Sequence, residues 1–293
     1  MNQRALFFVN RLSRQGRKNR IEAIVHLRRY GFELVEEPVS NPGEIPELIR
    51  QHQNKVDLVI IGGGDGTMNT AVDALVDTQL PLGILPMGTA NDLARTLKIP
   101  LSIPAACQTI ATGQTHYIDL GWVNGKHYFN VASMGLSVNI TRSLNKRVKR
   151  RWGILAYAIA AIQVLARSRP FRAEIRCNGQ SIQVKTVQIA VGNGLYYGGG
   201  MAIASDAAID DQRLDLYSLG INHWWEMFPL LPALRQGRLG NIDNVFTLEG
   251  TEMEVLTKKP ISINTDGEIT TETPAHFRVI PRILPVLVPS SRS

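Results

Sequence analysis

The sequence predicts a two-domain protein in which an α/β domain with a mostly parallel sheet precedes an antiparallel β-sandwich. In the first third of the chain, strand-like apolar runs alternate with helix-like segments, which is typical of a parallel sheet covered on both faces. After about Tyr117 the sequence changes to short β-like runs bounded by Gly, Asn and Asp, as in antiparallel sandwiches. At 293 residues the chain is long enough for two cores. We therefore expect domains at 1–118 and 119–276, with a tail at 277–289 that returns to the first domain as a strand.

The first domain is expected to alternate strand and helix from its start. Strands are expected at the apolar runs 5–9, 32–38, 56–61 and 82–85. Helices are expected around 19–30 and 42–53, and from Met68, where the residues up to Val76 have helix-like spacing. Parallel sheets bind ligands at the carboxyl ends of their strands. A glycine-rich segment that follows the third strand lies at such an end.

The second domain is expected to consist of short strands with two helices between them. The expected strands are 127–132, 172–177, 183–191, 214–219, 252–256 and 261–264. The expected helices lie near 151–167 and 224–236. This pattern predicts the antiparallel sandwich.

The composition indicates a folded protein of a reducing compartment. Hydrophobic residues make up 44% of the chain and charged residues 19%, which excludes a disordered protein. Cys107 and Cys177 are far apart in the sequence and show no C-x-x-C spacing, so no disulfide framework is expected. The start has no cleavable signal pattern, and the longest low-charge run, 152–166, is shorter than the roughly 20 residues that span a bilayer. We expect a cytoplasmic protein without a transmembrane helix.

The net charge is +7, and basic residues gather immediately before the run 152–166. They are Arg142, Lys146, Arg147, Lys149, Arg150 and Arg151. A basic segment beside an apolar helix suits an anionic membrane surface. A solvated helix end followed by a core helix explains the same pattern. Nucleic acid is not expected as a partner, because no aromatic residue beyond Trp152 is interleaved with these charges. The segment 142–166 is thus a candidate for peripheral contact with the inner face of the membrane.

The segment Gly62–Thr67, which follows the apolar run 58–61, is typical of a phosphate-binding turn. Glycines let the backbone take left-handed conformations and bring N–H groups against a polyanion. A helix that starts after the turn points its free N–H groups and positive dipole end at the same phosphates. No lysine follows Gly66 as in a Walker A loop, and the G-x-G-x-x-G pattern is not met. The alternative is a tight turn without a ligand.

A second turn, 83–92, again follows an apolar strand and again ends at a helix start. Thr89 or Asn91 is expected to cap that helix, while Gly88 lets the backbone approach a ligand. Alone, the pattern favours a well-capped helix. Two such turns on neighbouring strands would form facing walls of one cleft, and their coincidence favours a nucleotide.

Two carboxylates, Asp266 and Glu268, bracket Gly267 after the strand-like run 261–263. One could accept a proton from an incoming hydroxyl while the other binds Mg²⁺ or orients the first. An Asp-Gly turn is also the commonest signal of a β-hairpin. Both interpretations stay open at this point.

Further glycine and acidic segments lie at 192–194, 198–201 and 210–215. Clustered carboxylates and backbone carbonyls are the ligands that a hard divalent cation takes. Acidic turns also occur without any metal. The context of the other motifs favours the metal.

These motifs together resemble the diacylglycerol kinase catalytic-domain family, specifically its bacterial soluble lipid kinases of the YegS and DgkB type. The motifs are, in order, 62–67, 88–92, 192–194, 198–201, 210–211 and 266–268. The resemblance extends from Asn10 to about Val288, and motifs in a fixed order are more specific than any one of them. It implies an N-terminal domain similar to that of NAD kinase and phosphofructokinase, a C-terminal β-sandwich, and ATP bound in the cleft between them.

The resemblance also implies roles for individual residues. Asp266 would be the general base that takes the proton of the lipid hydroxyl, and Glu268 is similar to the family's active-site glutamate. Asp65, a third catalytic residue, would join Asp92 in the charged network around the phosphates and a catalytic Mg²⁺. The nucleotide-binding residues would be Asn10, Ser40, Gly63, Gly64, Asp65, Gly66, Thr67, Met68, Asn69 and Thr89.

A structural Mg²⁺ is also implied, held by Asp211 with the main-chain carbonyls of Ala208 and Arg213. Gln212 stands where the family usually has glycine, and because a non-glycine residue resists positive φ, that turn is expected to differ. Near the start, the segment 10–17 replaces the family's usual Asn-Pro-x-x-Gly turn, and Arg17 or Lys18 is the candidate for reaching phosphate.

The expected function is ATP-dependent phosphorylation of a lipid hydroxyl at a membrane surface. The nearest alternative enzyme is a NAD kinase, which shares the Gly-Gly-Asp-Gly motif, and 88–92, 198–201 and 266–268 favour the lipid enzymes over it. A nucleotide- or lipid-binding module without catalysis is the second alternative. Asp266 and Glu268 argue against it, and Gln212 for it. Diacylglycerol, phosphatidylglycerol, a sphingoid base and a polyprenol all offer a suitable hydroxyl, and a homodimer is the default assembly.

Overall fold

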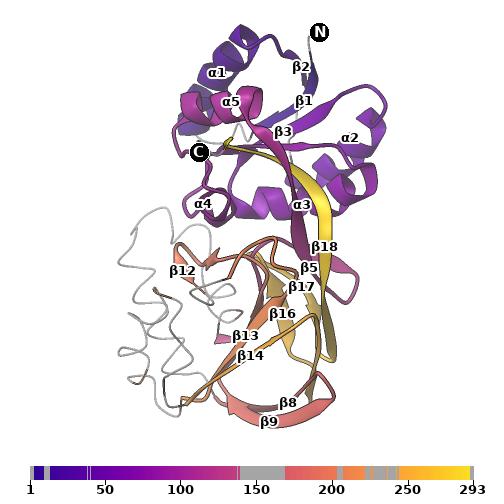
Figure 1. The fold of residues 1–293 in the computed structure, drawn as a ribbon, viewed down its shortest axis with the longest axis vertical. Coiled ribbons are helices and arrows are strands. Elements are labelled where there is room, and N and C mark those ends of the chain that lie inside the picture. Colours follow the sequence, from indigo (N-terminus) through magenta and orange to yellow (C-terminus); the bar gives the residue numbers. More distant parts are fainter. Residues whose placement is uncertain are drawn as a thin grey trace.

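The N-terminal part of the protein is the expected α/β unit (Figure 1). The computed structural model describes residues 3–9, 14–37, 39, 41–136, 138, 169–202, 207–221, 226, 236, 242 and 244–290. Its first strands are β1 (Arg4–Val9), β2 (Glu33–Glu36), β3 (Leu58–Gly63) and β4 (Leu82–Pro86). They lie in the order β2-β1-β3-β4, and each neighbouring pair is parallel. Helices cover both faces of such a sheet, so β3 is an apolar run that is buried along its whole length.

The helices of this unit lie in two groups on different sides of the sheet, α1 with α5 and α2 with α3 (Figure 1). They are α1 (Arg14–Arg29), α2 (Ile45–His52), α3 (Asp65–Thr78), α4 (Asp92–Thr96) and α5 (Ile103–Thr112), with a 3₁₀ turn η1 (Pro42–Glu44) before α2. The three expected helices are confirmed. The sequence reasoning missed α5, although Pro104 in its first turn is a recognised start signal.

A long sheet joins the two halves of the chain. Its strands follow the order β2-β1-β3-β4-β18-β15-β8-β9, and β5 pairs with both β18 and β6. The bounds are β5 (Gln114–Val123), β6 (Lys126–Tyr128), β8 (Phe171–Cys177), β9 (Gln180–Thr186), β15 (Glu252–Thr257) and β18 (Ala275–Val288). Figure 1 shows β18 running from the lower sheet up to the α/β unit, where Val286 pairs with Leu82 of β4. Residue 118 lies inside β5, and a domain boundary at that residue stays a prediction.

The second sheet is antiparallel and completes the predicted sandwich. Its order is β14-β13-β10-β7-β16-β17, and every pair in it is antiparallel. The bounds are β7 (Val131–Gly135), β10 (Gln188–Gly192), β13 (Leu214–Leu219), β14 (Val245–Gly250), β16 (Ser262–Thr265) and β17 (Glu268–Glu272), with a separate ribbon of β11 (Tyr196–Tyr197) and β12 (Met201–Ala202). Apolar side chains of both sheets share one core, as Met134 and Ile189 do with Val255 and Phe277. The predicted fold class is confirmed.

Some expected elements lie outside the described residues. These are the helix at 151–167, the basic and apolar segment 142–166, and most of the helix expected at 224–236. Among the described residues, no helix is both long and apolar enough to cross a membrane.

Candidate active site

The two glycine turns touch each other. They follow β3 and β4, which are neighbouring parallel strands, so both turns lie at the same edge of the sheet. A Cβ added at Gly88 would lie 2.4 Å from Cα of Gly64, a separation that real Cβ atoms do not show. Met87 also donates its N–H to the carbonyl of Gly63 at 2.9 Å. The absence of side chains at Gly64 and Gly88 is what allows this backbone contact.

Close packing, and not left-handed backbone, explains the glycines of the first turn. Gly64 has φ −102°, and none of the glycines at 62–66 is among those with positive φ. The expectation of left-handed conformations in this turn is therefore wrong. A Cβ at Gly62 would lie 2.7 Å from Val9 Cγ2, and one at Gly63 would lie 2.7 Å from Thr67 Cβ. Gly62–Gly64 nevertheless carry no side chains and lead directly into α3, so the N-terminus of that helix faces the edge of the sheet.

Asp65, the first residue of α3, caps the next helix. Its Oδ1 accepts the N–H of Leu93 in the first turn of α4 at 3.0 Å. The expectation that Thr89 or Asn91 caps α4 is wrong. Asn91 has φ 52° and makes no capping bond to the helix, because its side chain instead accepts the N–H of Gly88 at 2.8 Å. Asp65 thus supplies the acceptor from the other turn, which fixes the two turns to each other.

The nucleotide-binding residues expected from the sequence differ in what they expose. Thr89 is exposed, and Gly64–Thr67 are partly exposed. Met68 and Asn69 are each 2% exposed, so a ligand in front of the turn would meet little of their side chains. Asn10 and Ser40 lie outside the described residues.

Asp266 occupies a hairpin turn with its carboxylate turned inward. Asp266 and Gly267 have φ values of 47° and 102°, and they join β16 to β17. The carboxylate accepts three backbone N–H groups, from Phe129 at 2.7 Å, Asn130 at 2.9 Å and Val131 at 3.1 Å. Burial raises the pKa of Asp266, the three N–H groups lower it, and the charge of Asp65 raises it, with a result of about 6.

Glu268 extends from the same hairpin toward the first turn of α3. It is exposed, and its Oε1 lies 3.8 Å from the position that a Cβ at Gly66 would take. Asp65 lies close enough to Asp266 for its charge to act on that carboxylate. The structure therefore brings the three expected catalytic residues, Asp65, Asp266 and Glu268, together at the N-terminus of α3.

Asp92 connects the second turn to the glycine segment 198–201. It is 4% exposed, and its Oδ2 accepts the N–H of Gly199 at 2.8 Å. Gly198, Gly199 and Gly200 all have positive φ, which permits this loop to fold its N–H groups around one carboxylate. Burial raises the pKa of Asp92, partly offset by the Gly199 N–H. The bond to Gly199 therefore places the glycine segment 198–201 beside the turns at 62–67 and 88–92.

The loop at 208–213 is a poor match for a metal site. Asp211 accepts the N–H of Ala208 at 3.0 Å and that of Arg213 at 3.2 Å, and Nε of Arg213 lies 3.1 Å from Asp211 Oδ2. A guanidinium thus already supplies positive charge beside this carboxylate. Among the described residues, no three His, Cys, Asp or Glu side chains gather as a set of metal ligands. Gln212 has φ 61°, so the turn takes the left-handed conformation in spite of its side chain, contrary to the expectation that it would differ. The metal at Asp211 stays a prediction.

Sequence reasoning missed Asp119, which holds the middle of the molecule together. It is 1% exposed, and its carboxylate accepts the N–H of Gln212 at 2.6 Å and that of Arg282 at 2.7 Å. Burial raises its pKa, and the charges of Asp210 and Asp211 raise it further. The available signal was a single aspartate between the apolar residues Ile118 and Leu120, which suggests a buried carboxylate but names no partner.

Comparisons with known proteins match most of the chain to lipid kinases and their domains. The model of the diacylglycerol kinase catalytic domain matches residues 4–123, and that of the YegS C-terminal NAD kinase beta sandwich-like domain matches residues 130–288. A protein of Yersinia enterocolitica named "Probable lipid kinase YegS-like" is 33% identical over 275 residues, covering 91% of this chain and 91% of its own. A "Diacylglycerol kinase" of Bacillus subtilis is 27% identical over 281 residues, covering 94% and 93%. The fold is similar to that of a crystal structure described as a diacylglycerol kinase from Bacillus anthracis, with a TM-score of 0.81, 24% identity and coverage of 98% and 97%.

Proposed function

Because the chain belongs to the diacylglycerol kinase catalytic-domain family, we propose that it is a lipid kinase that transfers the γ-phosphate of ATP to a lipid hydroxyl. One observation carries this proposal. Two segments that are far apart in the sequence meet at the first turn of α3. They are the turn at 62–67 and the hairpin at 264–268. A glycine-rich turn at a helix N-terminus therefore stands beside a buried carboxylate, which is the pairing that phosphate transfer to a hydroxyl needs.

The nucleotide site is built from the two turns. The phosphates lie against Gly63–Thr67 and the N-terminus of α3, whose dipole favours negative charge. Thr89, exposed on the second turn, is the contact from the other side. Mg²⁺ fits this setting, because Asp65 and the phosphates would otherwise place like charges together. When bound there with Asp65, it neutralises phosphate charge.

Asp266 accepts the proton of the acceptor hydroxyl. With a pKa of about 6 it is ionised at pH 7, and its value is close enough to neutrality for a general base. The three N–H groups from Phe129 to Val131 hold its carboxylate in one orientation. Glu268, on the exposed side of the hairpin, faces the phosphates and orients the incoming hydroxyl.

The acceptor is a lipid of the diacylglycerol or phosphatidylglycerol type, presented at the cytoplasmic surface of the membrane. The chain works there as a peripheral protein and assembles as a homodimer. The structural Mg²⁺ implied at Asp211 is not part of this proposal, because the loop at 208–213 matches a metal site poorly, and metal analysis of the purified protein tests it. The names of the relatives support a lipid acceptor over NAD.

The test is transfer of labelled phosphate from ATP, with Mg²⁺, to a panel of diacylglycerol, phosphatidylglycerol, a sphingoid base, a polyprenol and NAD. We expect a lipid to be labelled and NAD to stay unlabelled. Asp266→Asn should lower the rate by at least about 10²-fold while ATP binding, measured by calorimetry, changes little. Asp77→Asn, at an exposed carboxylate near the C-terminal end of α3 that pairs with Arg50, is the control for loss of one carboxylate away from the site. Labelling of NAD alone, or ATP binding without transfer to any acceptor, would overturn the proposal.

A further inference from the structure

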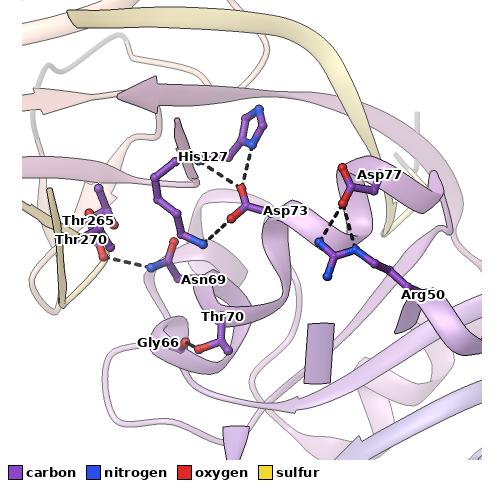
Figure 2. Close-up of polar contacts among 10 residues, drawn as sticks. Arg50, Gly66, Asn69, Thr70, Asp73, Asp77, His127, Thr265 and Thr270 are labelled. Carbon is purple, nitrogen blue, oxygen red and sulfur yellow. Dashed lines mark hydrogen bonds and ion pairs between the residues drawn. The ribbon is translucent and has the colours of Figure 1, made fainter. Parts of the chain in front are cut away.

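One face of α3 is bound to the hairpin that carries Asp266. Asn69 lies on this face one helical turn after Asp65, and its Nδ2 donates to the carbonyl of Thr265 at 3.1 Å (Figure 2). Thr265 is the residue immediately before Asp266, and it is fully buried. Because both residues are buried, this bond holds β16 at a fixed position relative to α3.

The same face also holds the segment that donates to the carboxylate of Asp266. Asp73, four residues after Asn69 and therefore on the same side of the helix, accepts Nδ1 of His127 at 2.8 Å and the ammonium group of Lys126 (Figure 2). It also accepts the backbone N–H of His127 at 3.3 Å. Burial alone would raise the pKa of Asp73, but the bonds from His127 and Lys126 outweigh it and lower the pKa to about 2. Asp73 is therefore a stable anion that fixes 126–127, two residues before the three donors.

The side chain of Asn69 is poorly placed for a nucleotide. It is 2% exposed, and its donor is used by Thr265. Within the described part of the chain, its Oδ1 has no hydrogen-bond partner. The resemblance implies that Asn69 contacts the nucleotide, but the geometry directs its amide toward β16.

We propose that Asn69 is a positioning residue for Asp266, which couples the phosphate-binding end of α3 to the base. The inference deepens the proposed function and rests on it. Asn69 holds the peptide that precedes Asp266, and Asp73 holds the segment that donates to its carboxylate. When α3 adjusts to the phosphates, the base and its three N–H donors move with it as one unit. Transfer then depends on Asn69, although nucleotide binding does not.

The test compares Asn69→Leu, which removes the donor and keeps the branched shape of the side chain, with Thr78→Val on the same helix. Thr78 is also buried and donates to the carbonyl of Ala74 at 2.8 Å, so this control also loses one buried bond but lies at the far end of α3. Asn69→Ala is made in parallel, because it removes the donor without adding bulk. For each variant, kcat at saturating ATP, the ATP dissociation constant and the ¹³C-carboxyl NMR titration of Asp266 are measured.

We expect both Asn69 variants to lower kcat by about 10- to 100-fold, the effect of a small misplacement of a reacting group. The ATP dissociation constant should stay within about 3-fold, because the contacts to phosphate are kept. The titration of Asp266 should move to higher pH, since a hairpin that relaxes loses N–H bonds to the charged form. Thr78→Val should show none of these changes.

Three results separate the possible outcomes. Weaker ATP binding with an unchanged Asp266 titration would overturn the inference and make Asn69 a nucleotide contact. Equal effects of Asn69→Leu and Thr78→Val would also overturn it, because they would reflect helix stability alone. If the wild-type protein transfers no phosphate but the Asp266 titration moves only in the Asn69 variants, the proposed function fails and the positioning role stands.

Discussion

The sharpest prediction concerns the pH dependence of phosphate transfer, because the raised pKa of Asp266 sets it. A base with a pKa of about 6 is ionised to about a tenth at pH 5, whereas an aspartate with the ordinary value of 3.8 would be more than nine-tenths ionised there. Single-turnover transfer at saturating ATP should therefore fall about tenfold between pH 7 and pH 5. Burial is the main cause of the raised pKa, and salt screens burial little. The fall in transfer rate between pH 7 and pH 5 should therefore persist when the ionic strength changes.

The same pKa predicts a change in folding stability that needs no substrate. Because the folded-state value lies above the ordinary one, the contribution of Asp266 to stability is present below pH 3.8 and is lost as the pH rises through about 6. The unfolding free energy of the wild type, relative to Asp266→Asn, should therefore increase by about 2.4 kcal/mol as the pH falls from 7 to 4. Urea titrations at both pH values measure it. A flat rate profile down to pH 5, together with an unchanged stability difference, would refute the assignment of a raised pKa to this carboxylate.

Three further variants test the packing around the site. Gly88→Ala places a Cβ 2.4 Å from Cα of Gly64, so the two turns must separate. Calorimetry should then show ATP binding at least about tenfold weaker. Unchanged binding would mean that the contact between the turns is not needed. Asp65→Ala removes the acceptor at the start of α4 and should lower the unfolding free energy by about 1 kcal/mol in urea, and an unaltered midpoint would contradict its capping role. Lys126→Met should lower the unfolding free energy by about 1 kcal/mol at pH 7. This loss should shrink below pH 4 as the pH falls toward 2, because Asp73 owes part of its lowered pKa to this lysine. A loss that does not vary with pH would exclude the ion pair as its cause.

Local sequence patterns were sufficient for most of the fold. The strands β3 and β4 are continuous apolar runs that end at glycine or proline, so periodicity and length identify them. By contrast, α5 and β5 were missed. The strand β5 contains Gly121, where a Cβ would lie 2.1 Å from the ring of Tyr128, so this glycine reflects a contact with the next strand. Glycine inside a strand weakens the local sequence pattern of that strand, so this contact made β5 harder to recognise.

The sequence predicted which residues would lie together at the candidate site, but not the bonds that connect them; their roles stay a prediction. The motifs identified Asp65, Asp266 and Glu268, and the structure places them together. The capping partner of α4 was wrong, because the acceptor comes from Asp65, 28 residues before Leu93. The partner of Asn69 lies 196 residues away in the sequence. Bonds of this length depend on how the strands are ordered in the sheets, and neither spacing nor periodicity carries that information.

The turn at Asp266 shows why two interpretations of one motif need not compete. As a hairpin turn, Asp266 and Gly267 both take positive φ, which reverses the chain between β16 and β17. This reversal puts the aspartate beside the start of the neighbouring strand β7, where Val131 and the two residues before it donate their N–H groups to its carboxylate. Asparagine would also tolerate the positive φ at this position. Its side-chain NH₂ group would however face the backbone N–H of Phe129 or of Asn130, and two donors cannot form a hydrogen bond. The hairpin therefore explains the position of the residue, and the three N–H groups explain why it is a carboxylate.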